Sequence, residues 1–455
     1  MAVGVCDFPS SETFRFPEDW YSRKRKCASV HTLGCRLNQS ESQLIKDSLI
    51  NAGYDLVPFG ESADLGIINT CTVTSEADSK CRQAIRKFIR KNPHAFTAVV
   101  GCYSQMAAMT IADIPGVDLI VGSQDKLNVH NYVRGGKTRH PIILDNRMGR
   151  EDFSINLFGA GSFEKRANLK IQDGCDFMCG FCIIPRARGR ARSRRLKNLM
   201  EEVDSLSQRG VREIILTGVN LGTFEQEGWN IVSIVDALDE QPGVERIRIS
   251  SIEPTTIPVD LLERMSDRAH ALLPYLHIPL QSGSDRVLNR MRRRYSVAEF
   301  VSFIRYANST VKDLCIGTDL LVGSPGEEED DFLKTCSVFS ENPFSYCHVF
   351  PYSKREGTFA AKQDGHVPDG VKAKRSAICR RLGAVRKYDY QKRYLGQVLE
   401  VLFEDKKDDY FPGYTENYIR VISRSKTEMT NRLAKVRLDR IRGDVVEGSV
   451  VKVLR

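Results

Sequence analysis

The sequence lacks both a long apolar run and an N-terminal targeting segment. A helix that crosses a bilayer needs about 18 or more apolar residues in a row, and no run of that length occurs. Asp7, Glu12, Glu18 and Asp19 interrupt the first residues, so these do not form the apolar centre of a signal peptide. Repeats of solenoid period and low-complexity tracts are also missing. These absences predict a cytoplasmic protein made of ordinary globular domains.

Cysteine and positive charge, in contrast, are plentiful. The 455 residues include 13 cysteines. A reducing cytoplasm disfavours disulfides, so ligation of a metal or cluster is the leading use for any cysteines that lie close together. The formal net charge of +9 suggests a polyanionic partner such as nucleic acid. Many proteins carry a modest excess of one sign, so charge alone leaves the partner open.

The first part of the chain alternates strands and helices, with a cysteine after each strand. Residues 1–26 show no periodicity and are expected to form an irregular extension, followed by a domain over 27–137. Apolar residues recur at helical spacing over 75–91. Such alternation predicts parallel strands whose carboxyl ends share one edge of a sheet. The strand-like runs are 28–33, 65–70 and 97–100, and the cysteines that follow them are Cys35, Cys71 and Cys102.

A connector over 138–160 leads to a longer alternation of strands and helices, over 161–392. Six βα units predict a partial barrel with its active site at the carboxyl ends of the strands. A basic helix over 371–394 leads to short, valine-rich strands in 393–455, with Pro412-Gly413 as turn residues, which suggests a small antiparallel barrel. The fold class is therefore α/β: a Rossmann-like domain, a partial (β/α)6 barrel and a terminal β-barrel. The barrel strands are expected at 167–172, 213–217, 246–250, 275–278, 315–322 and 346–350, and the terminal ones at 398–403, 419–421, 433–438 and 445–453.

Three closely spaced cysteines follow the first strand of the partial barrel. The thiolates of Cys175, Cys179 and Cys182 can ligate three irons of a [4Fe–4S] cluster and leave the fourth iron open for a substrate or cofactor. A zinc site would need a fourth ligand, and no histidine or further cysteine lies close on either side. The remaining alternative is three unrelated buried cysteines, which such tight spacing disfavours.

The pattern Cys-x-x-x-Cys-x-x-Cys after a first barrel strand resembles the radical S-adenosylmethionine (SAM) superfamily. Motifs at the later strand ends extend the resemblance: 217–222, 250–254, 277–285, 317–319 and 323–327. The resemblance implies that SAM chelates the open iron and is cleaved by one electron to a 5′-deoxyadenosyl radical. It makes four residues at the barrel rim candidates for SAM contacts, and no catalytic acid or base is assigned. These candidates are Asn220, Glu253, Gln281 and Asp319.

The first domain resembles that of the methylthiotransferases. The strings are Thr32-Leu33-Gly34-Cys35-Arg36-Leu37-Asn38-Gln39 and Asn69-Thr70-Cys71-Thr72-Val73. The resemblance implies that Cys35, Cys71 and Cys102 hold a second, auxiliary [4Fe–4S] cluster, whose open iron takes an exogenous sulfur species. The other cysteines match no ligand of the family and are expected to be small apolar residues. They are Cys6, Cys27, Cys81, Cys315, Cys336, Cys347 and Cys379.

Basic residues crowd two segments of the barrel region, and the terminal region resembles the RNA-binding TRAM domain. Like charges at this density favour phosphate contacts over a solvated face or a role at the SAM carboxylate. Tyr414 and Tyr418 could stack on unpaired bases, with core packing as the alternative. The basic residues are Arg186, Arg188, Arg190, Arg192, Arg194, Arg195 and Lys197, and Arg290, Arg292, Arg293 and Arg294.

Within the methylthiotransferases, the chain is most similar to the branch that acts on threonylcarbamoyladenosine in tRNA. The strings that favour this branch are 31–35, 182–189, 251–254 and 349–358. Arg186, Ser324 and Lys354 depart from the pattern of the branch. The resemblance implies methylthiolation at C2 of that nucleoside in the tRNA anticodon stem-loop, with flavodoxin or ferredoxin as a typical electron donor. Isopentenyladenosine, a ribosomal-protein aspartate and a non-catalytic iron–sulfur RNA-binding protein remain as alternatives.

Overall fold

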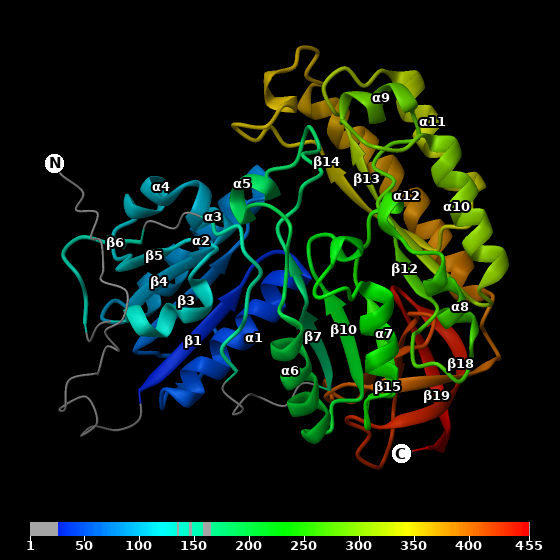
Figure 1. Cartoon of the computed structure of the whole chain (residues 1–455), viewed down its shortest axis with the longest axis horizontal. Helices are drawn as coiled ribbons and strands as arrows, with labels where there is room; N and C mark the ends of the chain where they lie inside the picture. The colour runs from blue at the N-terminus through cyan, green and yellow to red at the C-terminus, as the bar shows by residue number, and fades with distance from the viewer. Residues whose placement is uncertain (1–25, 134–135, 145–147, 158–164, 455) are drawn as a thin grey trace. The chain divides into compact units, whose positions relative to one another are not determined.

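The computed structural model describes residues 26–133, 136–144, 148–157 and 165–454 (Figure 1). The expected extension over 1–26 lies outside these residues except for Lys26. The chain divides into two compact units. Unit one consists of Met1–Ser162, Asp173–Phe177 and Cys182–Leu199, and unit two of Phe163–Gln172, Met178–Phe181 and Met200–Arg455.

Unit one contains a parallel sheet of six strands in the order β2-β1-β3-β4-β5-β6, coloured blue to cyan in Figure 1. One face of the sheet packs with α1 (Arg36–Asn51) and η2 (Lys126–Tyr132), and the other with α2 (Ser75–Lys91) and α4 (Ala108–Ala112). Helices on both faces of a parallel sheet confirm the predicted Rossmann-like domain. The strands are β1 (Cys27–Thr32), β2 (Asp55–Leu56), β3 (Leu65–Thr70), β4 (Phe96–Gly101), β5 (Leu119–Val121) and β6 (Ile142–Ile143).

Local sequence explains how α2 packs on β3. Every residue of β3 is buried, and a side chain at Gly66 would lie 2.2 Å from the ring of Phe88, so only glycine lets α2 approach the strand. The helix begins where the Thr74 side chain accepts a hydrogen bond from the Ala77 amide at 3.0 Å. Acidic residues in its first turn and basic residues in its last turn suit the helix dipole.

Unit two contains six parallel barrel strands in two sheets of three, ordered β11-β10-β7 and β12-β13-β14. An isolated parallel bridge between Ile247 and Leu272 links the first sheet to the segment before β12. This arrangement confirms the predicted partial (β/α)6 barrel. Its strands are β7 (Arg166–Lys170), β10 (Glu213–Thr217), β11 (Arg246–Ile249), β12 (Tyr275–His277), β13 (Cys315–Val322) and β14 (Tyr346–Pro351), and its helices include α6 (Leu196–Gln208), α7 (Ile231–Asp239), α8 (Asp260–Ser266), α9 (Asp285–Arg290), α10 (Val297–Thr310), α11 (Glu329–Glu341) and α12 (Asp369–Lys392).

The last strands close into a barrel in the order β15-β16-β17-β19-β18, which confirms the predicted terminal β-barrel. Two details differ from expectation. Pro412 and Gly413 lie inside a strand and not in a turn. Glycine is needed there because any side chain at Gly413 would lie 2.5 Å from the Leu402 carbonyl oxygen of the neighbouring strand. The pairing of β17 with β19 is parallel. The strands are β15 (Val398–Phe403), β16 (Phe411–Thr415), β17 (Arg420–Ser423), β18 (Leu433–Arg442) and β19 (Val445–Val453).

A buried ion cluster joins this barrel to the amino ends of β7, β10 and β11. Glu213, the first residue of β10, is fully buried and pairs with Arg166 at 2.7 Å and with Arg246 and Arg248 at 3.1 Å. Both Arg246 and Arg248 also donate to backbone carbonyls of 414–416 in the terminal barrel. Burial alone would raise the pKa of Glu213, but the three guanidinium groups outweigh it and hold this pKa well below its usual value.

None of the helices in the described parts of the chain is both long and apolar enough to span a membrane. The longest, α12, has 24 residues but carries charged side chains along its length.

Candidate iron–sulfur and SAM sites

The sheet of unit one brings Cys35, Cys71 and Cys102 to one edge. Cys71 directly follows β3, Cys102 follows β4, and Cys35 caps α1 shortly after β1. These three strands are neighbours, and their ends are in register because Thr32 pairs with Asn69 and Thr70 with Gly101. Cys71 and Cys102 are buried, whereas Cys35 is exposed. The donor set and its placement therefore fit a cluster with one side open.

Two asparagines hold the cysteine loops together. Asn38 Nδ2 donates to the carbonyls of Leu33, at 2.8 Å, and Thr70, at 3.0 Å, so one side chain ties the loops before Cys35 and Cys71. Asn69 Nδ2 donates to the Asn38 carbonyl at 3.0 Å. A side chain at Gly34 would lie 2.8 Å from the Cys71 sulfur, so glycine leaves room for that thiol. The family string contains both asparagines, but their residue type and spacing predict no role for them.

The thiols of this edge interact electrostatically. Burial raises the pKa of Cys71 to about 12, and the neighbouring Cys35 and Cys102 add to the rise. An iron ligand must be a thiolate, so loading this edge with iron releases protons, and acid opposes it.

The second cysteine set lies on the loop that follows β7. Cys175 and Cys182 belong to unit one and Cys179 to unit two. In unit one, the Cys175 amide donates to the Gly189 carbonyl at 3.2 Å. In unit two, the backbone of Gly180 is held on both sides: its amide donates to the Met291 carbonyl and its carbonyl accepts from the Ala360 amide, both at 2.7 Å.

Arg293 links Cys179 to one of the expected SAM residues. Its Nη1 lies 3.2 Å from the Cys179 sulfur and 3.1 Å from Glu253 Oε1, and its Nη2 donates to Glu253 Oε2. The Arg293 Nε also donates to the Tyr295 hydroxyl at 3.2 Å. Burial raises the pKa of Cys179, and the Arg293 charge opposes that rise. The sequence predicts Glu253 at the site but places Arg293 in a basic patch.

Asn220 and Gln281 occupy constrained positions at the barrel rim. Asn220 is 1% exposed, its Oδ1 accepts from the Thr256 hydroxyl at 3.0 Å, and its buried Nδ2 has no partner among the described residues. An unpartnered donor of this kind fits a bound polar ligand. Gln281 has a left-handed backbone, with φ of 66°, held by hydrogen bonds to Asp319 and Leu321 of β13.

Asp319 forms a hydrogen-bonded triad with two histidines from the neighbouring strands. Its Oδ1 lies 2.9 Å from His277 Nε2 and 3.3 Å from His348 Nδ1. His277 Nδ1 in turn lies 3.1 Å from the Tyr346 hydroxyl. Despite the burial of Asp319, the two histidines hold its pKa well below the usual value. The triad has metal-ligand spacing, but its hydrogen bonds account for the arrangement without an ion.

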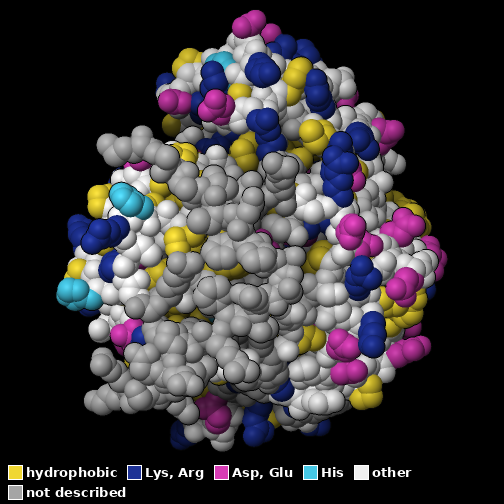
Figure 2. Space-filling view, turned by 60° about the vertical axis from the view of Figure 1, so that its left-hand side comes forward, with side chains coloured by type: hydrophobic (Ala, Val, Ile, Leu, Met, Phe, Trp, Pro, Cys, Tyr) yellow, Lys and Arg dark blue, Asp and Glu magenta, His cyan; other side chains and the backbone are white. Residues whose placement is uncertain are grey.

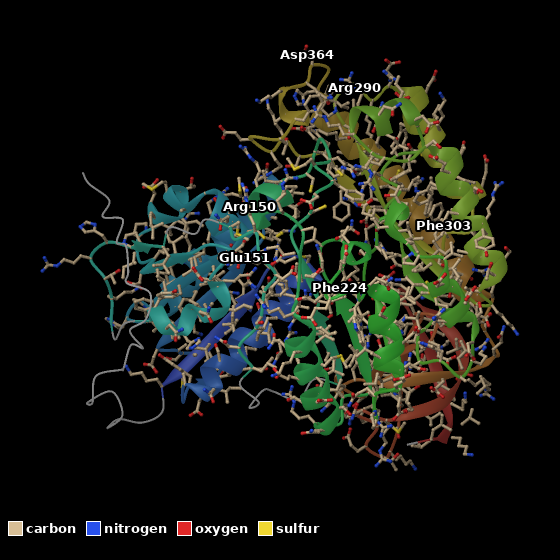
Figure 3. All side chains as sticks on the ribbon, viewed as in Figure 1. Arg150, Glu151, Phe224, Arg290, Phe303 and Asp364 are labelled. Atoms are coloured by element: carbon tan, nitrogen blue, oxygen red, sulfur yellow. The ribbon has the colours of Figure 1, made fainter. Side chains whose placement is uncertain are left out.

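The basic segments are less exposed than the RNA hypothesis requires. Arg188, Arg192, Arg194 and Arg293 are all buried. Arg290, labelled in Figure 3, donates to the backbone carbonyls of Pro325 and Asp364 at 2.9 and 3.3 Å. On the face shown in Figure 2, basic and acidic side chains of the described residues are interspersed. These five arginines are therefore held by partners within the protein, and RNA contact from the two segments is left to the exposed members, such as Arg190 and Arg294.

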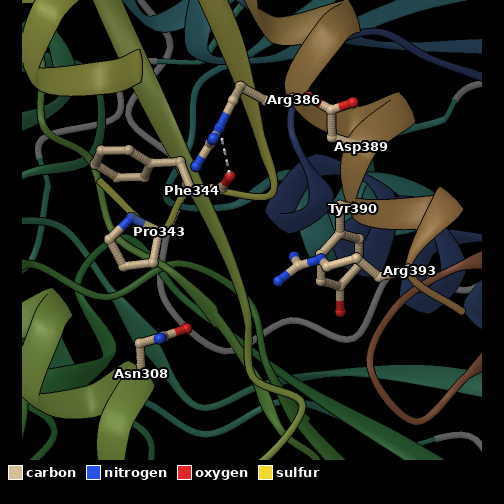
Figure 4. Close-up of a pocket in the computed structure, with 7 residues that line it drawn as sticks. All are labelled: Asn308, Pro343, Phe344, Arg386, Asp389, Tyr390 and Arg393. Carbon is tan, nitrogen blue, oxygen red and sulfur yellow. Dashed lines mark hydrogen bonds between the residues drawn. The ribbon is translucent and has the colours of Figure 1, made fainter. Parts of the chain in front are cut away.

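A hollow of about 270 Å³ lies in unit two between α10, the turn before β14, and α12 (Figure 4). Its lining includes Phe344, Tyr390 and Arg393. The Arg386 guanidinium in it donates to the carbonyls of Asn342 and Phe344. The hollow is lined by residues that precede β14, so it lies at the amino end of that strand. The polar rim residues gather at the opposite, carboxyl end.

Comparisons with known proteins agree with this geometry. Residues 27–122 match the family described as "Uncharacterized protein family UPF0004", and residues 169–339 match the radical SAM superfamily. A solved structure of the radical SAM methyltransferase TsrM from Kitasatospora setae has a TM-score of 0.50 at 13% identity, covering 71% of this chain and 73% of its own. That likeness shows a shared fold.

Curated relatives extend over nearly the whole chain. The threonylcarbamoyladenosine tRNA methylthiotransferase MtaB of Bacillus subtilis is 38% identical, over 94% of this chain and 96% of its own length. Its counterpart in Aquifex aeolicus is 34% identical over 86% and 95%. The tRNA-2-methylthio-N(6)-dimethylallyladenosine synthase of Aquifex aeolicus is 31% identical over 94% and 99%. With both cysteine sets at strand ends of the matched regions, the chain belongs to the radical SAM methylthiotransferases.

Proposed function

We propose that this enzyme converts N6-threonylcarbamoyladenosine, next to the anticodon of tRNA, into its 2-methylthio derivative. The observation that carries the proposal is the ranking of the relatives. Five relatives named for threonylcarbamoyladenosine are 31–38% identical, and two named for dimethylallyladenosine are 29% and 31% identical. Support also comes from the two cysteine sets, each of which can leave one iron open. The tRNA anticodon stem-loop, an electron donor such as flavodoxin or ferredoxin, a cytoplasmic location and the domain boundaries predicted above belong to the same proposal.

The enzyme uses SAM and two [4Fe–4S] clusters as cofactors. Bound SAM and the cluster of Cys175, Cys179 and Cys182 would supply the radical needed to break an aromatic C–H bond, which acid–base groups cannot do. Cys35, Cys71 and Cys102 would hold the cluster that presents sulfur. The chain's own rim residues bind and orient: Asn220 offers a buried donor, and Glu253 is fixed by both nitrogens of the Arg293 fork.

The proposal is tested with enzyme reconstituted anaerobically, SAM, dithionite and two tRNA substrates. One tRNA carries threonylcarbamoyladenosine and the other isopentenyladenosine, and nucleosides are identified by mass spectrometry. We expect 5′-deoxyadenosine and the methylthio product from the first tRNA only. The matched control replaces Cys81, a buried cysteine of α2, with alanine and should keep activity.

The other outcomes are informative. Product from the isopentenyladenosine tRNA alone would show that isopentenyladenosine is the substrate, and it would still support radical methylthiolation. Formation of 5′-deoxyadenosine with neither tRNA modified would contradict a substrate of either kind and favour a ribosomal-protein aspartate. Absence of 5′-deoxyadenosine with both clusters intact would overturn the radical mechanism and favour a non-catalytic RNA-binding protein.

A further inference from the structure

Arg188 is a fully buried cation within unit one. It is the last residue of α5 (Ile184–Arg188) and is 1% exposed. Its Nη1 donates to Glu41 Oε1 at 2.9 Å and to Asp173 Oδ1 at 3.0 Å. Its Nη2 donates to Glu41 Oε2 at 2.9 Å and to Asn38 Oδ1 at 2.7 Å. The four hydrogen bonds fix the guanidinium in one orientation.

The contact with Asn38 connects Arg188 to the cysteine edge. Asn38 is the side chain that donates to the carbonyls of Leu33 and Thr70, which precede Cys35 and Cys71. In addition, α5 packs against α3 (Cys102–Met106), whose first residue is the third cysteine of the edge. Burial lowers the pKa of Arg188, but the negative charges of Cys102, Glu41 and Asp173 outweigh burial and raise this pKa above its usual value. The group therefore stays charged.

Further charged side chains of the described residues surround Arg188. Glu41 also pairs with Lys126, and Asp173 lies 3.8 Å from Arg192. All five side chains are buried, so salt screens them little. These five side chains comprise two carboxylates and three cations, and the Arg188 charge acts on the thiols of Cys35 and Cys102. A [4Fe–4S] cluster on three thiolates is anionic and gains a further negative charge on reduction, which a nearby cation favours.

We propose that Arg188 is a positioning residue of the auxiliary cluster, which orders the Cys35 and Cys71 loops through Asn38 and raises the reduction potential of the cluster by its charge. The inference rests on the part of the proposed function in which Cys35, Cys71 and Cys102 hold a cluster, and it is independent of the tRNA substrate.

The test is a potentiometric titration with dithionite and mediators, followed by electron paramagnetic resonance. The full chain carries alanine at Cys175, Cys179 and Cys182, so that only the auxiliary cluster contributes. Arg188→Gln removes the charge and should move the midpoint to lower potential, while Arg188→Lys should stay near the parent. Arg190→Gln is the matched control, because Arg190 is 61% exposed and pairs with Asp176; its midpoint should not move.

Glu41→Gln separates an electrostatic role from a structural one. It disturbs the same network but removes a negative charge, so we expect its midpoint to move to higher potential, opposite to Arg188→Gln. Shifts of the same sign in both variants, an unshifted Arg188→Gln at full iron content, or an equal shift in Arg190→Gln would each overturn the proposal. If Arg188→Gln loses its iron, the other two variants decide. A midpoint near the parent for Arg188→Lys together with a raised midpoint for Glu41→Gln supports the proposal. Any other pair of results contradicts it.

The titration contains neither SAM nor tRNA, so its failure is distinguishable from that of the proposed function. Opposite shifts in the titration, together with no methylthio product in the tRNA assay, would support the role of Arg188 and contradict the proposed tRNA substrate. An alanine parent that binds no iron at all would instead overturn the auxiliary cluster, and with it the role of Arg188.

Discussion

The Nη1 nitrogen of Arg293 lies 3.2 Å from the sulfur of Cys179. The same guanidinium grips both carboxylate oxygens of Glu253, so one buried side chain connects a cluster ligand of unit two to a rim residue expected to contact SAM. Hydrogen bonds to cluster sulfurs are one way in which a protein sets a reduction potential.

Replacing Arg293 with glutamine should slow SAM cleavage. A hydrogen bond to a charged group contributes roughly 1.5–3 kcal/mol, which corresponds to a fall of about tenfold to a hundredfold in the rate of 5′-deoxyadenosine formation. Arg294→Gln is the matched control, because Arg294 is exposed and adjacent in sequence. Equal rates for Arg293→Gln and the control would show that the contact with Cys179 has no part in the reaction.

Iron content should report the two cysteine sets separately. Two [4Fe–4S] clusters give about eight irons per chain, so replacing Cys35, Cys71 and Cys102 together with alanine should leave about four. Cys81→Ala, which removes a buried thiol whose sulfur lies 3.4 Å from the Cys71 carbonyl, should keep about eight. A wild-type maximum near four irons would contradict the assignment of the unit-one cysteines as ligands.

Glu213→Gln should destabilise the protein strongly at neutral pH. It leaves three buried arginines without their shared carboxylate, and breaking a buried pair from one side costs roughly 3–5 kcal/mol of unfolding free energy. The melting temperature, followed by circular dichroism, should fall accordingly. Glu245→Gln removes the partly exposed pair with Arg212 and should cost about 1 kcal/mol or less.

The same carboxylate predicts a pH dependence. The pKa of Glu213 in the folded state is held below its usual value of 4.5, so its stabilisation is complete above that pH and is lost as the pH falls toward the folded-state pKa. The difference in melting temperature between wild type and Glu213→Gln should therefore shrink in acid. A difference that stays constant down to strongly acidic pH would contradict the ion cluster.

Tyr418→Ala should lower the melting temperature rather than tRNA affinity. The Tyr418 ring lies 4.3 Å from Tyr275, 4.9 Å from Tyr414 and 4.9 Å from the Arg248 guanidinium, so it packs between the terminal barrel and the barrel strands. Tyr418 is partly buried, so its loss should cost less than the roughly 3–5 kcal/mol typical of a fully buried aromatic. Tyr388→Ala, at an exposed position of α12, should leave stability unchanged. A stable Tyr418→Ala protein with clearly weaker tRNA binding in a filter assay would restore the base-stacking role.

Strand positions and the edge that carries the cysteines could be predicted from sequence because they follow local patterns. Cys35, Cys71 and Cys102 each come soon after an apolar run, and parallel strands align their carboxyl ends. The periodicity over 75–91 gave α2 with its bounds because each residue of an amphipathic helix reports the same face. The strand at 411–415 escaped because Pro412-Gly413 usually marks a turn, and only the closeness of Leu402 explains the glycine.

The burial of the arginines could not be predicted, because it depends on partners far away in sequence. Arg188 and Glu41 are 147 residues apart, and the sequence around Arg188 does not predict that this arginine pairs with a buried carboxylate. Arg293 and Glu253 are 40 residues apart, and the arginine stands among exposed ones. A run of like charges is typical of a solvated or phosphate-binding surface, and single members of such a run have no local mark that sets them apart.

The contact between Arg188 and Glu41 also bears on how the protein is made. Glu41 leaves the ribosome 147 residues ahead of its partner, and β7 of unit two is synthesised between them. At about 5–20 residues per second, Glu41 waits roughly 7 to 30 seconds for Arg188, and Lys126, its other cation, is synthesised in the meantime. The cysteine edge cannot take its final form before that segment arrives, so we expect iron to be inserted late in synthesis or after release of the chain.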